Sequence, residues 1–115
     1  MNIAIVGGRD FDDYDLLTKS VIKHYDITEI DGIVSGGAKG ADSLAERYAK
    51  EHDIYMKVFP AEWDLYGKSA GFRRNVRIIT SSDIVFAFWD GHSKGTKHSI
   101  DIARKQNKIL HIINY

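Results

Sequence analysis

The segment from Ser35 to Asp42 (SGGAKGAD) combines glycines, a hydroxyl, a cation and a carboxylate within eight residues. It follows a short apolar run and precedes a stretch of helical period, which places it in the loop between a strand and a helix. Backbone N–H groups at a helix start, together with the helix dipole, bind anions. Lys39 would add a positive charge and Ser35 a hydroxyl. We therefore predict a phosphate site formed by Ser35, Gly36, Gly37, Lys39 and Gly40.

The spacing of this loop differs from two common nucleotide motifs. No Lys-Ser or Lys-Thr pair follows the last glycine, as a P-loop requires, and the dinucleotide pattern G-x-G-x-x-G does not occur in it. A tight turn that binds nothing is the alternative interpretation. In that case Asp42 would serve only as a helix N-terminal acid that stabilises the first turn.

Glycines also accumulate in three further loops. Nine of the ten glycines lie in the four loops that follow predicted strands, and each of these loops holds at least two. Glycine permits positive φ angles and a close approach of the backbone to a ligand. A strand-to-helix turn explains one glycine per loop, whereas a pair in every loop indicates a ligand.

Trp63 and Tyr66 lie among charged residues in a glycine-flanked segment, residues 60–71. Aromatic rings in such a setting stack on bases, and Glu62 or Asp64 would read a base edge. The alternative is that both rings cap the core, which is the commoner fate of aromatic side chains.

Short β-branched apolar runs alternate along the chain with longer stretches of helical period. The runs predict strands at residues 3–6, 32–34, 55–59, 84–88 and 109–113. The helical stretches are residues 15–25, 41–51, 70–80 and 97–106. This alternation predicts right-handed crossovers and helices on both faces of a parallel sheet. We expect an α/β fold, a three-layer Rossmann-like doubly wound parallel sheet of five strands in the order 3-2-1-4-5, with a ligand crevice between the first and fourth strands.

The helix predicted at residues 70–80 carries an apolar stripe of Phe72, Val76 and Ile79. We expect one side of this helix to pack on the sheet and Ile78, which lies off the stripe, or a neighbouring residue to be left exposed. A small domain often covers such a residue in a symmetric dimer. The expected assembly is a homodimer or a higher homo-oligomer.

The composition is that of an ordinary globular chain with balanced charge. Its 115 residues include 16 basic and 16 acidic side chains, which give a formal net charge of +0 and a pI near 7.0. Proteins held on nucleic acid or anionic lipid by bulk charge need a basic excess, so neither an extended nucleic acid nor a membrane is expected as a partner. Zero cysteines exclude disulfides and thiolate chemistry and fit a cytoplasmic location. No apolar run approaches the roughly 20 residues of a membrane helix.

The charge is nevertheless uneven along the chain. Residues 1–31 hold seven acids and three bases, whereas residues 68–115 hold nine bases and three acids. Any recognition of an anion is therefore expected to be local.

Four motifs occur in order along the chain. They are Gly7–Phe11 (GGRDF), Ser35–Asp42, the stretch from Trp63 to Asn75, and the stretch from Asp83 to Thr96. Together they resemble the cpYpsA-related SLOG family over nearly the whole chain. The resemblance implies one SLOG-like, nucleotide-binding domain over residues 1–115, and it points to Arg74 as a residue of the site.

The SLOG superfamily also contains the Lonely-guy phosphoribohydrolases, in which a glutamate after a Gly-Gly-x-Gly-Thr motif serves N-glycosidic cleavage. Alignment on Gly95–Thr96 places Ser99 at the position of that glutamate. A hydroxyl cannot replace a carboxylate that stabilises an oxocarbenium ion or deprotonates water. Asp10, Asp90 or Glu62 would have to substitute. Whether the chain is an enzyme therefore stays open, and no catalytic residue is assigned.

DNA-processing protein A belongs to the same superfamily, and its second loop is similar to Ser35–Asp42, with Lys39 in place of an arginine. Lysine lacks the bidentate fork with which arginine binds phosphate. This resemblance implies binding of a single-stranded nucleic acid, a hypothesis that the neutral total charge places last.

The leading prediction from the sequence is therefore a domain that senses, carries or sequesters a nucleotide or nucleotide-derived small molecule. The second is an N-glycosidase or phosphoribohydrolase acting on a nucleoside monophosphate, and the third is single-stranded nucleic-acid binding. No cofactor is expected, and no metal, because His92 and His98 lack a matching carboxylate. The predicted ligand-binding residues are Gly7, Gly8, Arg9, Asp10, Ser35, Gly36, Gly37, Lys39, Gly40, Asp42, Trp63, Arg74, Asn75, Gly95 and Thr96.

Overall fold

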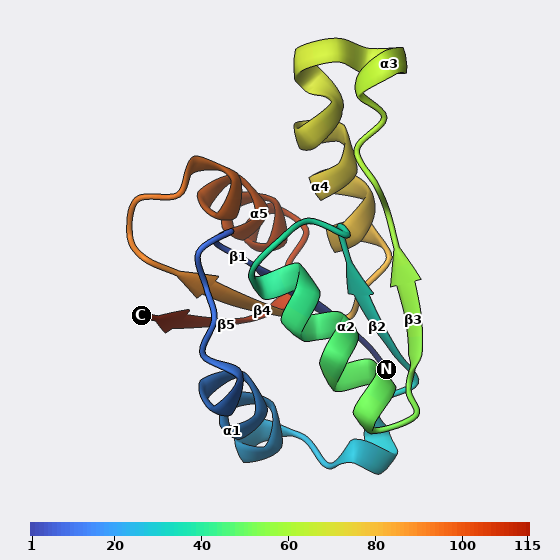
Figure 1. Cartoon of the computed structure of the whole chain (residues 1–115), viewed down its shortest axis with the longest axis vertical. Coiled ribbons are helices and arrows are strands. Elements are labelled where there is room, and N and C mark those ends of the chain that lie inside the picture. Colours follow the sequence, from blue (N-terminus) through green and yellow to red (C-terminus); the bar gives the residue numbers. More distant parts are fainter.

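A parallel sheet of five strands forms the centre of the computed structural model, which describes residues 1–115 (Figure 1). The strands lie in the order β3-β2-β1-β4-β5, and every neighbouring pair is parallel. Their bounds are β1 Asn2–Gly7, β2 Gly32–Ser35, β3 Tyr55–Val58, β4 Ile84–Trp89 and β5 Ile109–Asn114. The predicted fold class and strand order are confirmed.

Five α-helices and two short 3-10 turns connect the strands. They are α1 Tyr14–His24, α2 Ala41–Glu51, α3 Trp63–Tyr66, α4 Ala70–Thr80 and α5 Lys94–Lys105, with η1 Ile27–Glu29 and η2 Gly67–Ser69. α2 and α4 have the predicted bounds. α5 begins earlier than predicted because the Ser93 side chain accepts a hydrogen bond from Thr96 N and caps the helix. None of these helices has both the length and the apolar character needed to cross a bilayer.

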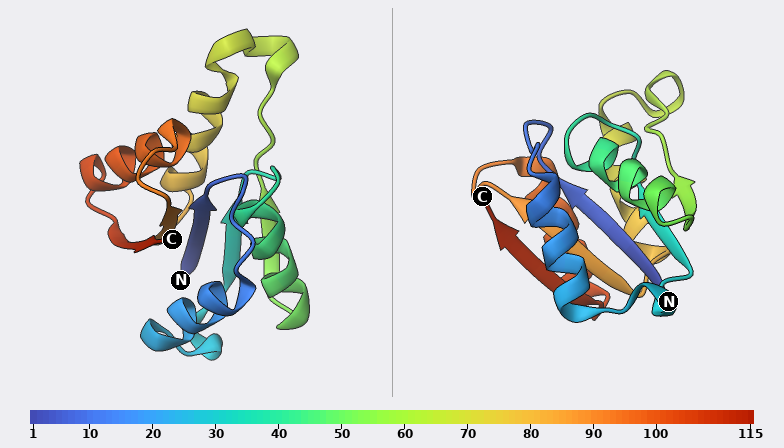
Figure 2. Two further views of the ribbon diagram at one scale, coloured as in Figure 1. Left: turned by 60° about the vertical axis from the view of Figure 1, so that its left-hand side comes forward. Right: turned by 60° about the horizontal axis from the view of Figure 1, so that its bottom comes forward.

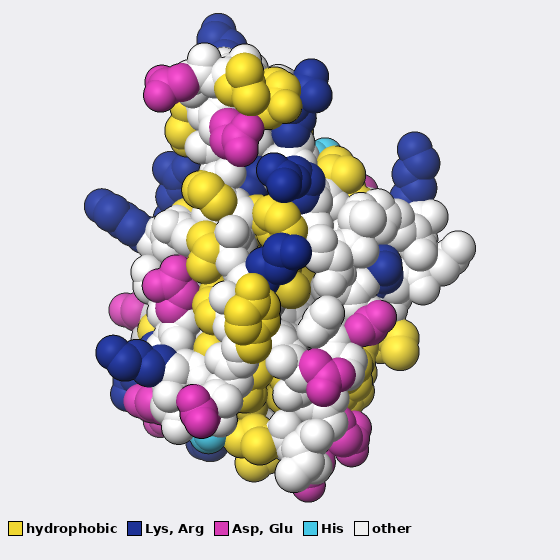
Figure 3. Space-filling model, turned by 90° about the vertical axis from the view of Figure 1, so that its right-hand side faces the viewer, with side chains coloured by type: hydrophobic (Ala, Val, Ile, Leu, Met, Phe, Trp, Pro, Cys, Tyr) yellow, Lys and Arg dark blue, Asp and Glu magenta, His cyan; other side chains and the backbone are white.

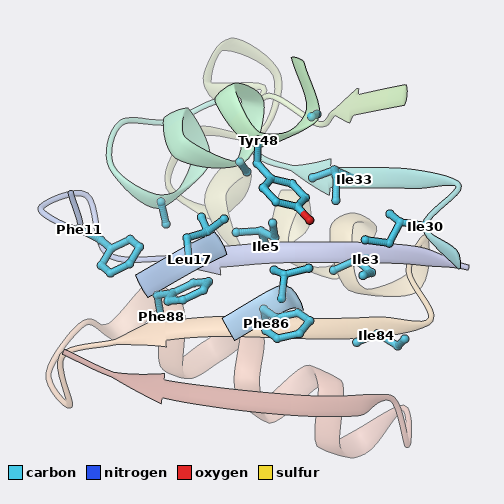
Figure 4. Packing of buried hydrophobic residues seen from close by; sticks show 14 residues of the cluster. Ile3, Ile5, Phe11, Leu17, Ile30, Ile33, Tyr48, Ile84, Phe86 and Phe88 are labelled. Atoms are coloured by element: carbon cyan, nitrogen blue, oxygen red, sulfur yellow. The ribbon is translucent and has the colours of Figure 1, made fainter. Parts of the chain in front are cut away.

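α1 and α2 cover one face of the sheet (Figure 2). Side chains alternate between the faces along each strand, so Ile3 and Ile5 of β1 point to this face while Ala4 and Val6 point to the other. Leu17 of α1 packs on the first face together with aromatic side chains of β4 (Figure 4). The central strand is therefore buried on both sides and holds the loops at its carboxyl end in place.

α4 and α5 cover the opposite face, where Ile78 and Ile79 of α4 are buried. The prediction for α4 is correct for Ile79, which is buried, and wrong for the other residues: Ile78 is 2% exposed, whereas Phe72 and Val76 are 54% and 41% exposed. The first half of α4 extends beyond the end of the sheet, so its side chains have no strand beneath them (Figures 1 and 2). The homo-oligomer stays a prediction, and it now depends on Phe72 and Val76 instead of Ile78.

A projecting arm lies at the carboxyl end of β3 (Figure 1). We define the arm as residues 60–77, which include α3, η2 and most of α4. α3 was not predicted, because a single turn of four residues shows no helical period. Its amides at Leu65 and Tyr66 both donate to Glu62 O, at 3.1 and 3.0 Å.

Candidate functional site

A cleft lies where the carboxyl ends of β1 and β4 meet, at the position expected for a ligand site in this strand order. Its volume is about 470 Å³. The first loop, α2, α4 and the start of α5 all contribute to its walls. The lining residues are Val6, Gly7, Gly8, Arg9, Asp10, Ala38, Asp42, Arg74, Asn75, Ile78, Asp90, Ser93, Gly95, Thr96 and Ser99.

Backbone contacts fix the first loop, residues 7–10. Gly8 N donates a hydrogen bond to Phe88 O, and Gly8 O accepts one from Ala41 N, both at 3.2 Å. A Cβ at Gly7 would lie 2.7 Å from Phe88 O, so a larger residue would push the loop away from β4. The loop is thus held between β4 and the start of α2, with the exposed Arg9 side chain at the cleft.

Asp10, beside Arg9, accepts a hydrogen bond of 2.6 Å from the Tyr115 hydroxyl. Burial and this bond raise the pKa of Tyr115, so its hydroxyl stays protonated and can donate. Arg9 forms no ion pair within the chain. The Asp10 carboxylate is therefore bonded to Tyr115, whereas the Arg9 guanidinium is free to bind a ligand.

The second loop, residues 36–40, packs against the first loop and against α4. Gly40 has a φ of +73°, and a Cβ there would lie 2.3 Å from Gly8 O, so this position requires glycine. A Cβ at Gly36 would lie 2.4 Å from Arg74 Nη1. These glycines make room for other parts of the protein. Lys39 is exposed and does not line the cleft.

Arg74 reaches the cleft from α4 and is half-buried. Its Nη1 donates to Gly36 O at 3.0 Å and its Nε donates to Asn75 Oδ1 at 3.1 Å. It forms no ion pair with a carboxylate. Burial lowers the pKa of Arg74, and the charge of Asp42 opposes this shift. A guanidinium carries five N–H donors, so Arg74 is a positioned cation with donors to spare.

Asp42 lines the cleft at the start of α2 and is 8% exposed. Its Oδ2 accepts a hydrogen bond of 3.0 Å from Ala38 N. Burial raises the pKa of Asp42, although the Ala38 amide and the Arg74 charge act in the opposite direction. Ser35 is completely buried and does not line the cleft. Its hydroxyl forms no hydrogen bond of normal geometry, yet it lies near enough to Asp42 to lower the pKa of that carboxyl.

Asp90 and Ser93, which follow β4, form another wall of the cleft. Asp90 Oδ1 accepts hydrogen bonds from Ser93 N and His92 N, both at 2.8 Å. These bonds lower the pKa of Asp90, so its carboxyl is ionised at neutral pH. Ser99, which stands where Lonely-guy proteins have their glutamate, is buried in the same wall.

Asn75 joins α4 to the start of α5 at the edge of the cleft. Its Nδ2 lies 3.3 Å from His98 Nδ1 and 3.5 Å from Gly95 O. Burial lowers the pKa of His98, so this ring is neutral at pH 7 and its Nδ1 can accept from the amide. The side-chain oxygen of Asn75 stays directed at Arg74 Nε.

The structure brings most of the predicted ligand-binding residues together and leaves the others outside the cleft lining. Those in the lining are Gly7, Gly8, Arg9, Asp10, Asp42, Arg74, Asn75, Gly95 and Thr96. Those outside it are Ser35, Gly36, Gly37, Lys39, Gly40 and Trp63. The second loop contributes little to the lining because its glycines pack against other loops, and Trp63 lies on the arm.

Several lining residues were not among the predicted ligand-binding residues. They are Val6, Ala38, Ile78, Asp90, Ser93 and Ser99. Asp90 and Ser93 directly follow a predicted strand, so the rule that ligand sites gather at the carboxyl ends of strands would have found them. Ile78 was missed because it was expected on the outer side of its helix.

Comparisons with known proteins assign the chain to a family. The sequence model of the YspA, cpYpsA-related SLOG family (YAcAr) matches residues 1–66. The Gene 61 protein of Mycobacterium phage D29 is 34% identical over 89 residues, which are 72% of this chain and 70% of that protein. The chain belongs to the YspA, cpYpsA-related SLOG family. The predicted family is thereby confirmed.

Among solved structures, this SLOG domain is similar to DNA processing protein A from Helicobacter pylori, a structure described as showing a unique single-stranded DNA binding mode. The TM-score is 0.65 at 23% sequence identity, and the match covers 97% of this chain and 64% of that chain. This chain thus spans less than two thirds of the matched protein. The likeness shows a shared fold.

This comparison corrects two predictions. The sequence analysis put a nucleotide-derived small molecule first and argued against an extended nucleic acid. A protein of the same fold that binds single-stranded DNA contradicts that order, and single-stranded nucleic acid agrees better with the findings. The physical error was to use net charge, which is a sum over the molecule, although phosphate contacts depend on the charges near the site.

Proposed function

We propose that this domain binds single-stranded nucleic acid, with a backbone phosphate held in the cleft by Arg9 and Arg74. The observation that carries the proposal is that both arginines line the cleft and neither forms an ion pair within the chain. Arginine presents a planar fork of donors that matches phosphate oxygens. A cytoplasmic location, expected from the lack of cysteine, forms part of this proposal.

The carboxylates of the cleft have a different role in this proposal. Asp10, Asp42 and Asp90 each accept a hydrogen bond from within the protein, so their positions are fixed. Carboxylates accept hydrogen bonds from amino groups on base edges, as from N4 of cytosine. A single strand exposes both its phosphates and its base edges, whereas a duplex hides the Watson–Crick edges. Those N–H donors of the bases that are used in Watson–Crick pairing are open to a carboxylate only in a single strand, so the combination of free arginines and fixed carboxylates favours a single strand.

The basic side chains of the protein also gather near this site. Figure 3 shows Lys and Arg side chains around the arm and α4, while acidic side chains are commoner on the lower part of that face. This arrangement follows from the sequence, in which residues 68–115 hold nine bases and three acids. The neutral total charge is thus compatible with a basic surface beside the cleft.

The proposal is tested by fluorescence anisotropy with labelled single-stranded oligodeoxynucleotides, the same sequences as RNA, and the matching DNA duplex. We expect the single strands to bind more tightly than the duplex. Arg74→Ala should lower the affinity by about tenfold to a hundredfold, since a charge-assisted hydrogen bond contributes about 1.5–3 kcal/mol. The salt dependence should also become shallower, by about 0.7 in the log–log slope for each phosphate that the variant no longer neutralises.

Arg47→Ala is the matched control, because Arg47 pairs with Glu51 at 3.0 Å and stacks on Tyr14, away from the cleft. This variant should bind like the parent protein. The proposal fails if no single strand binds, or if Arg74→Ala and Arg47→Ala have the same affinity. Equal affinity for duplex and single strand would also contradict it.

A further inference from the structure

The arm carries a second, shallow hollow that shares a residue with the cleft. It is lined by Pro60, Glu62, Tyr66, Ala70, Arg73, Arg74 and Arg77. Arg74 lines both this hollow and the cleft, so the two sites meet at one guanidinium. A ligand longer than one nucleotide that leaves the cleft at Arg74 would pass over the surface of this hollow.

We propose that a single strand held in the cleft continues past Arg73 and Arg77 onto Trp63 and Tyr66, which act as base-stacking side chains of the arm. This inference rests on the proposed function and extends it from one phosphate contact to a track. Single-stranded nucleic-acid sites combine a basic groove, which follows the backbone, with aromatic rings on which bases stack. The arm contains both elements.

The aromatic rings of the arm are open to solvent. Trp63 and Tyr66 are 53% and 41% exposed. The indole of Trp63 lies over the first turn of α4, where its Cη2 would be 3.4 Å from a Cβ placed at Gly71. The ring therefore lies beside Gly71 and stays open to solvent. The arm extends beyond the sheet (Figure 1), and both rings on it are exposed. They do not cap the core, which was the alternative interpretation of the sequence.

The cations of the arm are already positioned by aromatic rings. The Arg73 guanidinium lies 4.4 Å from the centre of the Tyr66 ring, and its Nε donates to Ser69 Oγ at 3.1 Å. Arg77 lies 4.8 Å from the centre of the Phe59 ring. Stacking of this kind holds the guanidinium groups in place before a ligand arrives, which reduces the entropy lost on binding.

The charge of the hollow suits a polyanion. Three arginines line it, against the single carboxylate of Glu62. Glu62 lies 3.9 Å from Arg77 at a solvent-exposed position, a weak ion pair that a phosphate can displace. The charge of the hollow therefore complements a nucleic-acid backbone.

The experiment measures affinity against oligonucleotide length, with single-stranded oligo(dT) of about 4 and about 16 nucleotides, the limits of typical single-strand sites. We expect the longer strand to bind more tightly to the parent protein. Trp63→Ala and Tyr66→Ala should weaken the longer strand by roughly fivefold to a hundredfold, since stacking of one base has an effect of that size. Both variants should bind the shorter strand like the parent protein, and Trp63→Phe should retain most of the affinity.

Tyr55→Ala is the control, because Tyr55 is a more accessible ring, 69% exposed, at the opposite end of β3. Photo-crosslinking of the longer strand, with 5-iodouracil in place of thymine, should mark Trp63 or Tyr66. The track is overturned if the arm variants bind the longer strand as tightly as Tyr55→Ala does, or if no crosslink forms on the arm. It is also overturned if the arm variants lose the same affinity for the shorter strand as for the longer one. Failure of the parent protein to bind either strand would instead refute the proposed function.

Discussion

The cleft and the arm share α4 but differ in how their residues are held. At the cleft, loops pack so closely that Gly40 has room for nothing but hydrogen at its Cα, and the lower half of α4 is buried through Ile79. On the arm, a Cβ placed at Gly67 would have no atom within 4 Å, and Phe72 is 54% exposed. A helix that extends past the end of the sheet thus contributes to the core with one half and to the surface with the other.

The largest expected effect separates the two halves of α4. Ile79→Ala should lower the free energy of unfolding by about 2–5 kcal/mol, because Ile79 is completely buried and the substitution leaves a cavity. Phe72→Ala should change it by about 0.5 kcal/mol or less, as is usual for an exposed position. Urea denaturation monitored by far-UV circular dichroism measures both. Equal losses would show that the arm is part of the core.

A second comparison concerns two glycines with positive φ. Gly40 and Gly67 have φ angles of +73° and +57°. Gly67→Ala should lower stability by about 1 kcal/mol, the cost of the backbone conformation alone. Gly40→Ala should lower it further, because its Cβ would contact the first loop at Gly8 O. Thermal denaturation measures the stability difference.

Gly40→Ala should also weaken single-strand binding, because displacement of the first loop moves Arg9. Gly67→Ala should leave the binding of short strands unchanged. If Gly67→Ala lowered both the stability and the single-strand affinity more than Gly40→Ala did, the cleft would not be the more tightly packed of the two regions.

The smallest expected effect is on the pH dependence of stability. Burial raises the pKa of Asp42, so the folded state favours the protonated carboxyl. The stability that Asp42 contributes is therefore complete at low pH and is lost as pH rises through its folded-state pKa. Asp42→Asn should remove this loss, so that the parent protein becomes less stable relative to the variant as the pH rises above about 4, the ordinary pKa of an aspartate.

Asp64→Asn, at an exposed position on the arm, is the matched control for the loss of one acidic side chain. Urea denaturation at a series of pH values gives the difference curve. A parent protein that gains stability over Asp42→Asn as the pH rises would show that the Arg74 charge outweighs burial at this carboxyl.

The strands and most helices could be predicted because their signals are local. β1 and β4 are continuous apolar runs, and the bounds of α2 follow from its helical period. What local patterns could not provide was the position of each helix relative to the end of the sheet. The prediction for Ile78 failed for that reason, since the periodicity of α4 is the same whether or not a strand lies beneath it.

The cleft could be predicted in part, from the rule that loops at the carboxyl ends of parallel strands lie together. This rule places Arg9 and Gly95 at the same edge of the sheet, and both residues line the cleft. It did not distinguish glycines that line a cleft from glycines that let loops pack, as Gly36 and Gly40 do. That distinction depends on contacts between distant segments, such as Gly36 with Arg74, which no short motif contains.

The pairing of β1 with β4 has a consequence for how the protein folds. Ile3 lies opposite Ile84, and Asp10 is bonded to Tyr115, so the contacts that complete the cleft join residues 81 and 105 positions apart. Contacts of such long sequence separation form late and slow the folding reaction. The cleft therefore exists only in the fully assembled protein. A ligand that binds it will slow global unfolding and raise the melting temperature with its concentration.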